Sequence, residues 1–511
     1  MQTAVAVAKV WIGGEWRDSD AEGMFEAENP ATGEKLGRAF PVSGWDDCDR
    51  ALTAAVDAAH ALERIPGEKI AAFLEAYAKE LDADAEAIVQ AAHEETGLPV
   101  APRLKDVELP RTTDQLRQAA AAAREGSWRK PTIDKAKNLR SCLAPIGPVV
   151  VFGPNNFPFA FNGVSGGDFA AAIAAGNPVI AKAHPLHPYT SQRMAEAAAR
   201  ALKSTGLPAA TVQMIYKLSH AKGERLVSDP RIGAVGFTGS KGAGMKLKHA
   251  ADGAGKPIYL EMSSLNPVVF LPAGLKENTE KWAKELAESC MMGCGQFCTR
   301  PNLALLIESE VTEAFLREVA ATFESRETHA LLSSAGRNQL HESIEALQSA
   351  GAKLVTGGKN VPGKGYRYAS TLLRVPGKDF LKAAHELQRE AFGNEVMVIV
   401  AADEAELLQV LEHLEGQLTG TVYSAASGAD DALYSRIEPV LRRRVGRLLN
   451  DKMPTGVAVS PAMNHGGPFP ATGHPGFTAV GIPTSIVRFT ALQSYDNVRE
   501  DRLPACLKDR G

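Results

Sequence analysis

The sequence predicts an α/β protein built around a doubly wound, mostly parallel sheet, with a second α/β lobe and a small β element. Three observations indicate this. The 511 residues are 45% hydrophobic and 23% charged, close to globular averages, and the length corresponds to about three domains. Short β-rich runs alternate with helical runs between 148 and 270, and a second such cycle extends from about 268 to 460. Such alternation is typical of parallel strands joined by right-handed crossovers.

Composition and charge exclude several classes of protein. The 56 Lys and Arg residues nearly balance the 60 Asp and Glu residues, so the chain lacks the basic excess of proteins that bind nucleic acid or anionic membranes. No apolar run reaches the ~18 residues of a transmembrane helix, and the first residues lack the basic region of a signal peptide. The cysteines are too sparse for a disulfide framework, and we expect a reducing, cytoplasmic compartment. They are Cys48, Cys142, Cys290, Cys294, Cys298 and Cys506.

The N-terminal part is predicted to be helical over 45–95 and 110–124, where Ala, Leu and Glu recur with helical periodicity. Gly97 and Pro99 separate the two stretches, and Pro110 suits the first turn of the second.

Extended segments begin at residue 138, where LRSCLAPIGPVVVFGP contains two β-rich runs joined by Pro145–Gly147. The strands predicted for the first cycle are 148–152, 177–182, 211–216, 232–237 and 257–262. The helices predicted between them lie near 166–175, 189–204, 221–228 and 241–251. The second cycle contains NPVVFL, a helix over 278–292, LALLIE, a helix over 310–324 and VMVIVA. The β-rich tail 485–498 lies outside both cycles, and we expect it to pair with another element or another subunit.

Chemically useful side chains follow the predicted strands of the first cycle. Asn156 comes after the first strand, Lys182 ends the second, the turn 238–244 follows the fourth, and Glu261 ends the fifth. Because ligands bind beyond the carboxyl ends of parallel strands, these groups predict a binding site at one rim of the sheet.

Each of these groups also has an ordinary structural interpretation. Gly239 and Gly244 in FTGSKGAG either admit a pyrophosphate at a helix N-terminus or simply form a strand–helix turn. Lys182 either binds a nucleotide or reaches from the rim to water. Glu261 is either a general base or a salt-bridged rim residue, and Asn156 either stabilises an oxyanion or forms a turn.

Cys298 lies in GCGQFCT, in the loop after a predicted helix. A thiolate there suits nucleophilic attack, whereas a buried inert thiol is the commoner fate of a single cysteine. Cys290, Cys294 and Cys298 are spaced by four residues, but no fourth ligand lies nearby, so we expect no metal.

Seven segments in this order resemble the NAD(P)-dependent aldehyde dehydrogenase superfamily over about residues 10 to 500. They are PNNFPF, GNPVIAK, GFTGSKGAG, LEMSS, GQFCT, EAFGNE and NHGGPFPATG. The resemblance implies a Rossmann-like cofactor domain (1–137 and 152–267), an α/β catalytic domain (268–475) and an oligomerisation β-flap (138–151 and 476–511). It also implies a homodimer or homotetramer.

The resemblance assigns roles to residues. It implies that Cys298 is the nucleophile, Glu261 the general base and Asn156 the oxyanion donor together with the Cys298 backbone N–H. The implied reaction adds the thiolate to an aldehyde, transfers hydride to NADP or NAD, and hydrolyses the resulting thioester with Glu261 as base. The residues implied to contact the cofactor are Lys182, Gly239, Ser240, Gly244, Glu390 and Phe392.

The sequence departs from the broad family pattern at several positions. Asn155 replaces a Trp, Ser263 and Ser264 replace glycines, and Asn394 replaces a Pro. Pro185 stands where a Glu often binds the adenosine ribose, which removes a repulsion against a 2′-phosphate and predicts that NADP is accepted. The residues considered as phosphate ligands are His184, Lys217, His220 and Lys222.

KAHPLHPYTSQ and MNHGGPFPATGHPGFTAVG resemble the subgroup that oxidises 2-oxoglutarate semialdehyde (2,5-dioxopentanoate), which is related to an NADP-dependent fatty-aldehyde branch. An anionic substrate requires a cation, and the resemblance favours Arg111 over Arg117, with Arg300 as second choice. A solvated surface arginine is the alternative for each. Phe157 and His465 are also implied to lie at the substrate; the alternatives for His465 are tuning of the Cys–Glu chemistry or a structural hydrogen bond.

Three other functions remain open from the sequence. They are oxidation of another aldehyde, such as a fatty aldehyde or another semialdehyde, a non-catalytic protein that keeps the fold, and metal binding through the three spaced cysteines.

Overall fold

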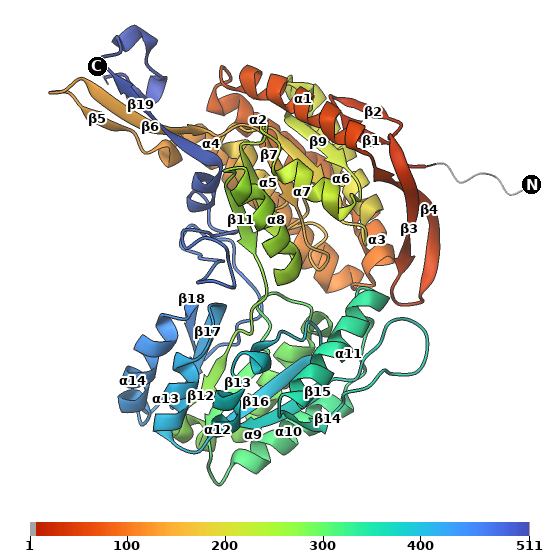
Figure 1. Ribbon diagram of the computed structural model, residues 1–511, viewed down its shortest axis with the longest axis vertical. Helices are drawn as coiled ribbons and strands as arrows, with labels where there is room; N and C mark the ends of the chain where they lie inside the picture. Colours follow the sequence, from red (N-terminus) through yellow and green to blue (C-terminus); the bar gives the residue numbers. More distant parts are fainter. Residues whose placement is uncertain (1–6, 510–511) are drawn as a thin grey trace, which may run out of the picture.

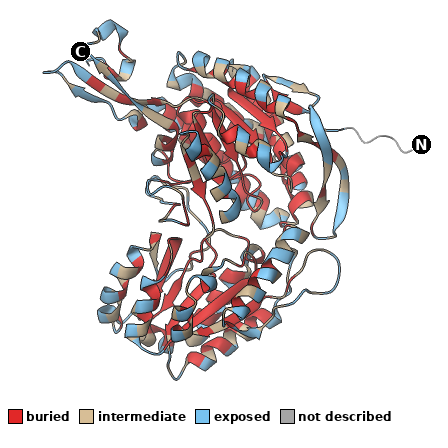
Figure 2. Ribbon diagram, in the orientation of Figure 1, coloured by how far each residue is buried: buried red, intermediate tan, exposed pale blue. Residues whose placement is uncertain are grey.

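Two seven-stranded, mostly parallel sheets form the two lobes of the molecule in the computed structural model (Figure 1). The structure describes residues 7–509. Buried residues fill the sheets and the inner faces of their helices, whereas exposed residues lie on the outer helix faces (Figure 2).

The first sheet has the strand order β11-β10-β7-β8-β9-β1-β2. Its five parallel strands are β7 (Val149–Phe152), β8 (Val179–Lys182), β9 (Val212–Ile215), β10 (Ala234–Thr238) and β11 (Ile258–Glu261). The pairing is parallel throughout these five, which confirms the predicted doubly wound sheet. The chain reverses direction across the sheet between β7 and β10, and such a switch point opens a crevice at the carboxyl ends of the strands.

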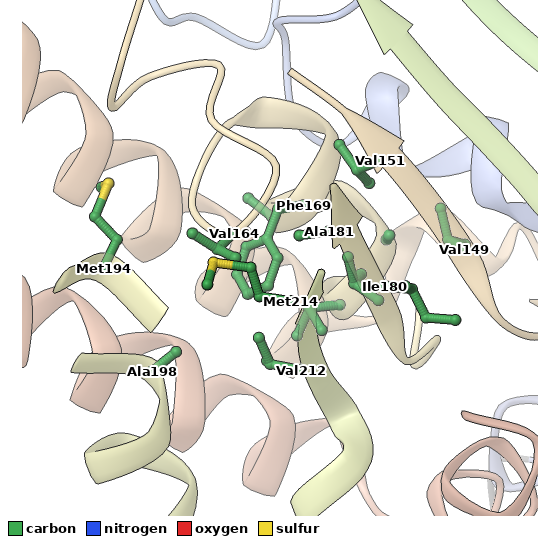
Figure 3. Packing of buried hydrophobic residues seen from close by; sticks show 14 of the residues in the cluster. Val149, Val151, Val164, Phe169, Ile180, Ala181, Met194, Ala198, Val212 and Met214 are labelled. Atoms are coloured by element: carbon green, nitrogen blue, oxygen red, sulfur yellow. The ribbon is translucent and has the colours of Figure 1, made fainter. Parts of the chain in front are cut away.

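Helices cover this sheet as predicted, with bounds that differ from the expected ones by at most two residues. They are α5 (Gly167–Ala174), α6 (Pro188–Thr205), α7 (His220–Val227) and α8 (Lys241–Gly253). Figure 3 shows Val151 and Ile180 of the strands packed near Phe169 of α5 and Met214 of β9. The β-branched strand residues are buried on both faces because helices lie on both sides.

The N-terminal part adds an edge and a helical layer to the first lobe. Strands β1 (Val10–Ile12) and β2 (Glu15–Arg17) extend the sheet antiparallel, and β3 (Ala21–Asn29) pairs with β4 (Glu34–Ser43). The helices that follow are α1 (Trp45–Leu62), α2 (Gly67–Ala83), α3 (Ala85–Thr96), the π-helix η1 (Val100–Glu108) and α4 (Leu109–Glu125). Pro110 lies in the first turn of α4, as predicted.

The second sheet has the order β14-β15-β16-β13-β12-β17-β18. Its strands are β12 (Val268–Phe270), β13 (Leu303–Ile307), β14 (Lys353–Thr356), β15 (Thr371–Pro376), β16 (Glu395–Ala401), β17 (Gln417–Tyr423) and β18 (Val445–Asn450). The flanking helices are α9 (Pro272–Met291), α10 (Thr312–Ser325), α11 (Ser334–Ser349), α12 (Gly377–Lys382), α13 (Glu404–Glu412) and α14 (Asp431–Arg442). Helix α9 begins six residues before the predicted start. The predicted start coincides with a kink inside the helix, at Asn278.

A three-stranded antiparallel sheet projects from the first lobe (Figure 1). Here β6 (Leu139–Pro145) pairs with β5 (Thr132–Asp134) and with the C-terminal β19 (Thr490–Asp496). The β-rich tail therefore pairs within its own chain. The expected boundary of the flap after residue 151 lies inside β7. This strand pairs with β8 and β10 and therefore belongs to the first sheet.

No helix within residues 7–509 is both long enough and apolar enough to cross a membrane.

Candidate active site

Three reactive side chains from distant parts of the sequence meet in one place. Glu261 ends β11, Cys298 follows the turn after α9, and His465 lies in the irregular segment after β18. Cys298 Sγ lies 3.5 Å from His465 Nε2, which lies 2.9 Å from Glu261 Oε1. Glu261 and His465 are buried, whereas the thiol remains half-buried and open to small molecules.

The shared nitrogen determines what this group can do with a proton. His465 Nε2 carries at most one hydrogen. When it carries that hydrogen, it donates to Glu261 Oε1 or Cys298 Sγ; when it does not, it accepts a hydrogen from one of them. Burial raises the pKa of the Cys298 thiol, and the nearby Glu261 carboxylate raises it further, while Arg111 opposes both. The thiol therefore needs a base in contact with it before it can attack, and His465 and Glu261 supply such a base.

The backbone before Cys298 takes an unusual course. Gly293, Cys294 and Gly295 have φ values of 57°, 54° and 68°, in the left-handed region that favours glycine. A Cβ atom at Gly295 would overlap the carbonyl group of Gly393. The glycines of GCGQFCT thus allow the chain to turn tightly and present the thiol.

Asn266 holds the loop on the other side of the thiol, and the sequence did not identify it. Its Nδ2 donates to the carbonyl oxygens of Cys298 (2.9 Å) and Arg300 (2.8 Å). Asn266 is fully buried with φ +50°, a conformation that Asn tolerates better than most residues. An Asn in the SSLNP turn was the only sequence signal for this contact.

Asn156 lies beside the same loop. Its Nδ2 donates to the carbonyl oxygen of Gln296 at 2.9 Å, two residues before Cys298. An amide group has two hydrogens, so a second one remains for another acceptor. The backbone N–H of Cys298 makes no hydrogen bond within residues 7–509.

An arginine and a glutamate that the sequence did not identify hold the Asn156 loop in place. Arg103 of η1 donates to the carbonyl oxygen of Asn156 at 3.1 Å and pairs with Glu108. The buried Glu108 carboxylate also accepts the backbone N–H groups of Phe159 (2.9 Å) and Ala160 (3.1 Å). The pair joins η1 to the turn after β7 and so positions Asn156.

Aromatic rings and one arginine cluster beside Cys298 and His465, and the Phe161 ring lies 5.8 Å from the His465 ring. The Phe157 ring lies 5.4 Å from Phe161 and 5.2 Å from Phe297, edge-on in both cases. The Arg111 guanidinium lies 5.3 Å from the Phe161 ring centre, and its Nε and Nη2 are buried without a partner within residues 7–509. Burial lowers the Arg111 pKa. A buried guanidinium with two unpaired donors is suited to an anion.

The structure separates Arg111 from the two other candidate arginines. Arg117, on the same helix, pairs with Asp82 at the surface. The expectation for Arg300 is wrong, because its side chain is fully buried and donates to backbone carbonyls of Glu395, Ala391 and Pro301. Arg300 braces the chain around β16 and does not line the approach to the thiol.

The residues expected at a cofactor come from both lobes, from the end of β8 and from the segment before β16. Lys182 ends β8 and forms no ion pair within residues 7–509. Burial, with a contribution from Lys217, lowers its pKa to about 8. Burial also raises the pKa of Glu390 to about 7, while a hydrogen bond from Ser263 opposes this. Phe392, two residues further on, is half-buried.

The glycine turn leads directly into helix α8. Ser240 is its N-cap, and the Ser240 Oγ accepts the backbone N–H of Ala243 at 3.4 Å. A Cβ atom at Gly239 would lie 2.9 Å from the Phe237 ring, and one at Gly244 would lie 3.1 Å from Met262 Sδ. A side chain at Gly239 would therefore displace the Phe237 ring, and one at Gly244 would press on Met262. In the described part of the chain the N–H groups of Lys241 and Gly242 make no hydrogen bond, so they suit an anion, as at other helix N-termini.

The four residues considered for a 2′-phosphate differ in their surroundings. Lys222 pairs with Glu22, and His184 stacks on His187 with 5.3 Å between ring centres. Lys217 forms no ion pair within the described residues and acts electrostatically on Lys182. For His220, at the start of α7, the structure gives no such contact. Of these four residues, Lys217 is thus the one that lowers the pKa of Lys182 by its charge and that forms no ion pair in the part of the chain described.

The spaced cysteines do not form the metal cluster considered from the sequence. Cys290 is buried and donates to the carbonyl oxygen of Pro301 at 3.3 Å, and Cys294 is buried separately. Within residues 7–509, the ligand atoms of Glu261, Cys298 and His465 instead lie within 4.8 Å of one another.

Comparison with known proteins gives a consistent result. Residues 16–439 match the aldehyde dehydrogenase family. The chain is 39% identical to alpha-ketoglutaric semialdehyde dehydrogenase 2 of Azospirillum brasilense over 511 residues, covering 95% of this chain and 94% of the relative. It is 36% identical to alpha-ketoglutaric semialdehyde dehydrogenase of Acinetobacter baylyi over 496 residues, covering 95% and 93%.

Solved structures share the fold at lower identity. An aldehyde dehydrogenase from Bartonella henselae has a TM-score of 0.81 at 19% identity, covering 96% of this chain and all (100%) of that one. A 1-pyrroline-5-carboxylate dehydrogenase has a TM-score of 0.82 at 24% identity, covering 96% and 92%. These likenesses concern the fold alone.

Proposed function

The chain belongs to the aldehyde dehydrogenase family, and from this premise we propose that it oxidises 2,5-dioxopentanoate to 2-oxoglutarate with NADP or NAD. The observation that carries the substrate is Arg111. Its Nε and Nη2 are buried, have no partner in the described part of the chain and lie beside the Phe161 ring and within electrostatic range of Cys298, so they suit the distal carboxylate of a semialdehyde. The names of the two relatives support the same substrate.

The first chemical step is deprotonation of Cys298. His465 Nε2 accepts the thiol proton and, once protonated, is held by Glu261 Oε1 at 2.9 Å. The thiolate then attacks the aldehyde carbon. The second amide hydrogen of Asn156 and the Cys298 backbone N–H stabilise the oxyanion that forms.

The cofactor residues fit a dinucleotide. Lys182 and Glu390 are half-buried polar groups that suit ribose hydroxyls, and the N-terminus of α8 suits a pyrophosphate. Gly239, Ser240 and Gly244 belong to the turn that begins α8, and Phe392, two residues after Glu390, stays a predicted cofactor contact. When bound, NAD or NADP accepts the hydride. Lys217 favours NADP, since it adds a free cation beside Lys182.

Glu261 completes the cycle. One of its carboxylate oxygens contacts His465, whereas Oε2 is buried with no partner within residues 7–509. This oxygen is suited to take a proton from water, which then attacks the thioester carbon and releases the acid from Cys298.

We also propose a homodimer or homotetramer that assembles through the β5–β6–β19 sheet. Ile133, Leu139 and Leu492 expose 37%, 39% and 70% of their surface there. Exposed apolar residues on a projecting sheet favour association with a second copy. The free thiols, including the nucleophile, suit the reducing cytoplasm.

The test compares kcat/KM for 2,5-dioxopentanoate, succinate semialdehyde and decanal, each with NAD and with NADP, followed by the absorbance of the reduced cofactor. We expect 2,5-dioxopentanoate to be the best substrate. A preference for decanal would support the fatty-aldehyde alternative and would overturn both the substrate and the role of Arg111.

A further inference from the structure

We infer that Cys298, His465 and Glu261 also form an inhibitory binding site for a thiophilic divalent cation, with Zn²⁺ as the best match. The sulfur, nitrogen and oxygen atoms of the three side chains lie within 4.8 Å of one another. Thiolate, imidazole and carboxylate are the three ligand types that zinc uses in proteins.

The spacing of two ligands already fits zinc. Bonds of about 2.3 Å to sulfur and about 2.0 Å to nitrogen at a tetrahedral angle place the two ligand atoms about 3.5 Å apart. Cys298 Sγ and His465 Nε2 are separated by 3.5 Å. The 2.9 Å between Nε2 and Glu261 Oε1 is that of a hydrogen bond, so the carboxylate withdraws slightly when the ion replaces the shared proton.

A second, independent observation points to a ligand at the same place. Glu261 is 1% exposed, and its Oε2 has no hydrogen-bond partner within residues 7–509. Burying such an acceptor unpaired is costly, and a bound cation removes that cost. Arg111 acts on the thiol only through its longer-range charge and is hydrogen-bonded to neither ligand.

The site has an entrance and room for an exchangeable ligand. Cys298 is half-buried, unlike Glu261 and His465, so an ion and a water molecule reach the group from the side of the sulfur. Three protein ligands and one open position characterise accessible zinc sites in enzymes. On binding, the sulfur–zinc bond replaces the S–H bond and that proton leaves to solvent, while His465 binds through an unprotonated Nε2 and carries its ring hydrogen on Nδ1.

Occupancy of this site blocks catalysis by two routes. Zinc withdraws charge from the thiolate and occupies the space beside the sulfur, which weakens its attack on an aldehyde, and a zinc-bound Glu261 no longer accepts a proton from water. Because the same three groups carry the proposed chemistry, zinc and aldehyde exclude each other. The ion therefore acts as a reversible competitive inhibitor that a chelator removes.

The experiment measures binding without turnover. The chelator-treated enzyme is dialysed against Zn²⁺, and alkylation of Cys298 by iodoacetamide is followed by mass spectrometry with and without the ion. Co²⁺ is used in parallel, because a cobalt–thiolate bond gives a characteristic charge-transfer absorption. We expect one ion per chain, protection of Cys298 from alkylation, and thiolate-bound cobalt.

Variants identify the ligands. Cys298→Ser, His465→Ala and Glu261→Gln are each expected to weaken Zn²⁺ binding at least tenfold, whereas the control Cys506→Ser, at another half-buried cysteine, binds as wild type. Circular dichroism checks that each variant is folded. Unchanged alkylation of Cys298 in wild-type enzyme with bound Zn²⁺ would overturn the proposal, as would zinc affinity that depends on Cys298 alone. These readouts do not depend on which aldehyde the enzyme oxidises.

Discussion

Replacement of Arg111 by leucine tests the proposed substrate most directly. Arg111 has two buried donors, Nε and Nη2, with no partner among the described residues, and in the proposed complex a distal carboxylate accepts from both. A hydrogen bond to a charged group contributes at least ~1.5 kcal/mol, so loss of two costs about 3 kcal/mol. At 1.4 kcal/mol per factor of ten, kcat/KM for 2,5-dioxopentanoate falls about 100-fold.

An uncharged aldehyde of similar length should respond differently. Pentanal has no carboxylate, and Arg111→Leu removes a charge whose burial is unfavourable. Its kcat/KM should therefore change by less than about threefold or increase. The assay is initial-rate kinetics with both aldehydes at saturating cofactor.

The matched control lies on the same helix. Arg117 points to the surface and pairs with Asp82, so Arg117→Leu should leave both substrates almost unaffected. Equal losses on dioxopentanoate and pentanal in Arg111→Leu would refute the reasoning, because Arg111 would then act on the fold or on Cys298 and not on the carboxylate.

The remaining predictions concern the oxyanion contacts, the cofactor and the assembly. Arg103→Ala should lower kcat about 10-fold or more, since it frees the Asn156 carbonyl and loosens an oxyanion donor, and it should also lower the melting temperature, since it leaves the buried Glu108 carboxylate without its partner; Arg103→Lys should restore part of the rate in steady-state kinetics. Lys217→Ala should raise KM for NADP about two- to fivefold, the range of an exposed ion pair, and leave KM for NAD unchanged. Because the pKa of Lys182 is lowered to about 8, its ammonium is charged below that pH and neutral above it, so cofactor affinity measured by fluorescence titration should fall as pH rises through 8. Leu492→Asp should shift the assembly toward smaller species in light scattering, and an unchanged mass would exclude this sheet as the interface.

Local sequence patterns were sufficient for the first lobe. The runs at 148–152, 177–182, 211–216, 232–237 and 257–262 are short, β-branched and flanked by turn residues, and each became a buried parallel strand. The second lobe was harder. Its strands β14, β15, β17 and β18 were not predicted, and the predicted start of α9 was the position of its internal kink.

The sequence by itself determined the fold class, the rim positions of Asn156, Lys182 and Glu261, and the cysteine in a glycine-rich turn. These depend on neighbours along the chain, because periodicity and glycine conformations are local properties. Only the tertiary structure decided that His465 stands between Glu261 and Cys298, 204 and 167 residues away in sequence.

Tertiary structure also distinguished side chains that look alike in the sequence. Arg103, Arg111, Arg117 and Arg300 are all arginines near predicted motifs, yet one braces the Asn156 loop, one is left without a partner at the approach to the thiol, one lies at the surface and one is buried in a second-lobe loop. The reason is that a guanidinium's role depends on which acceptors lie around it in three dimensions. Those acceptors are backbone carbonyls and carboxylates from elements that become neighbours only when the two sheets and their loops pack.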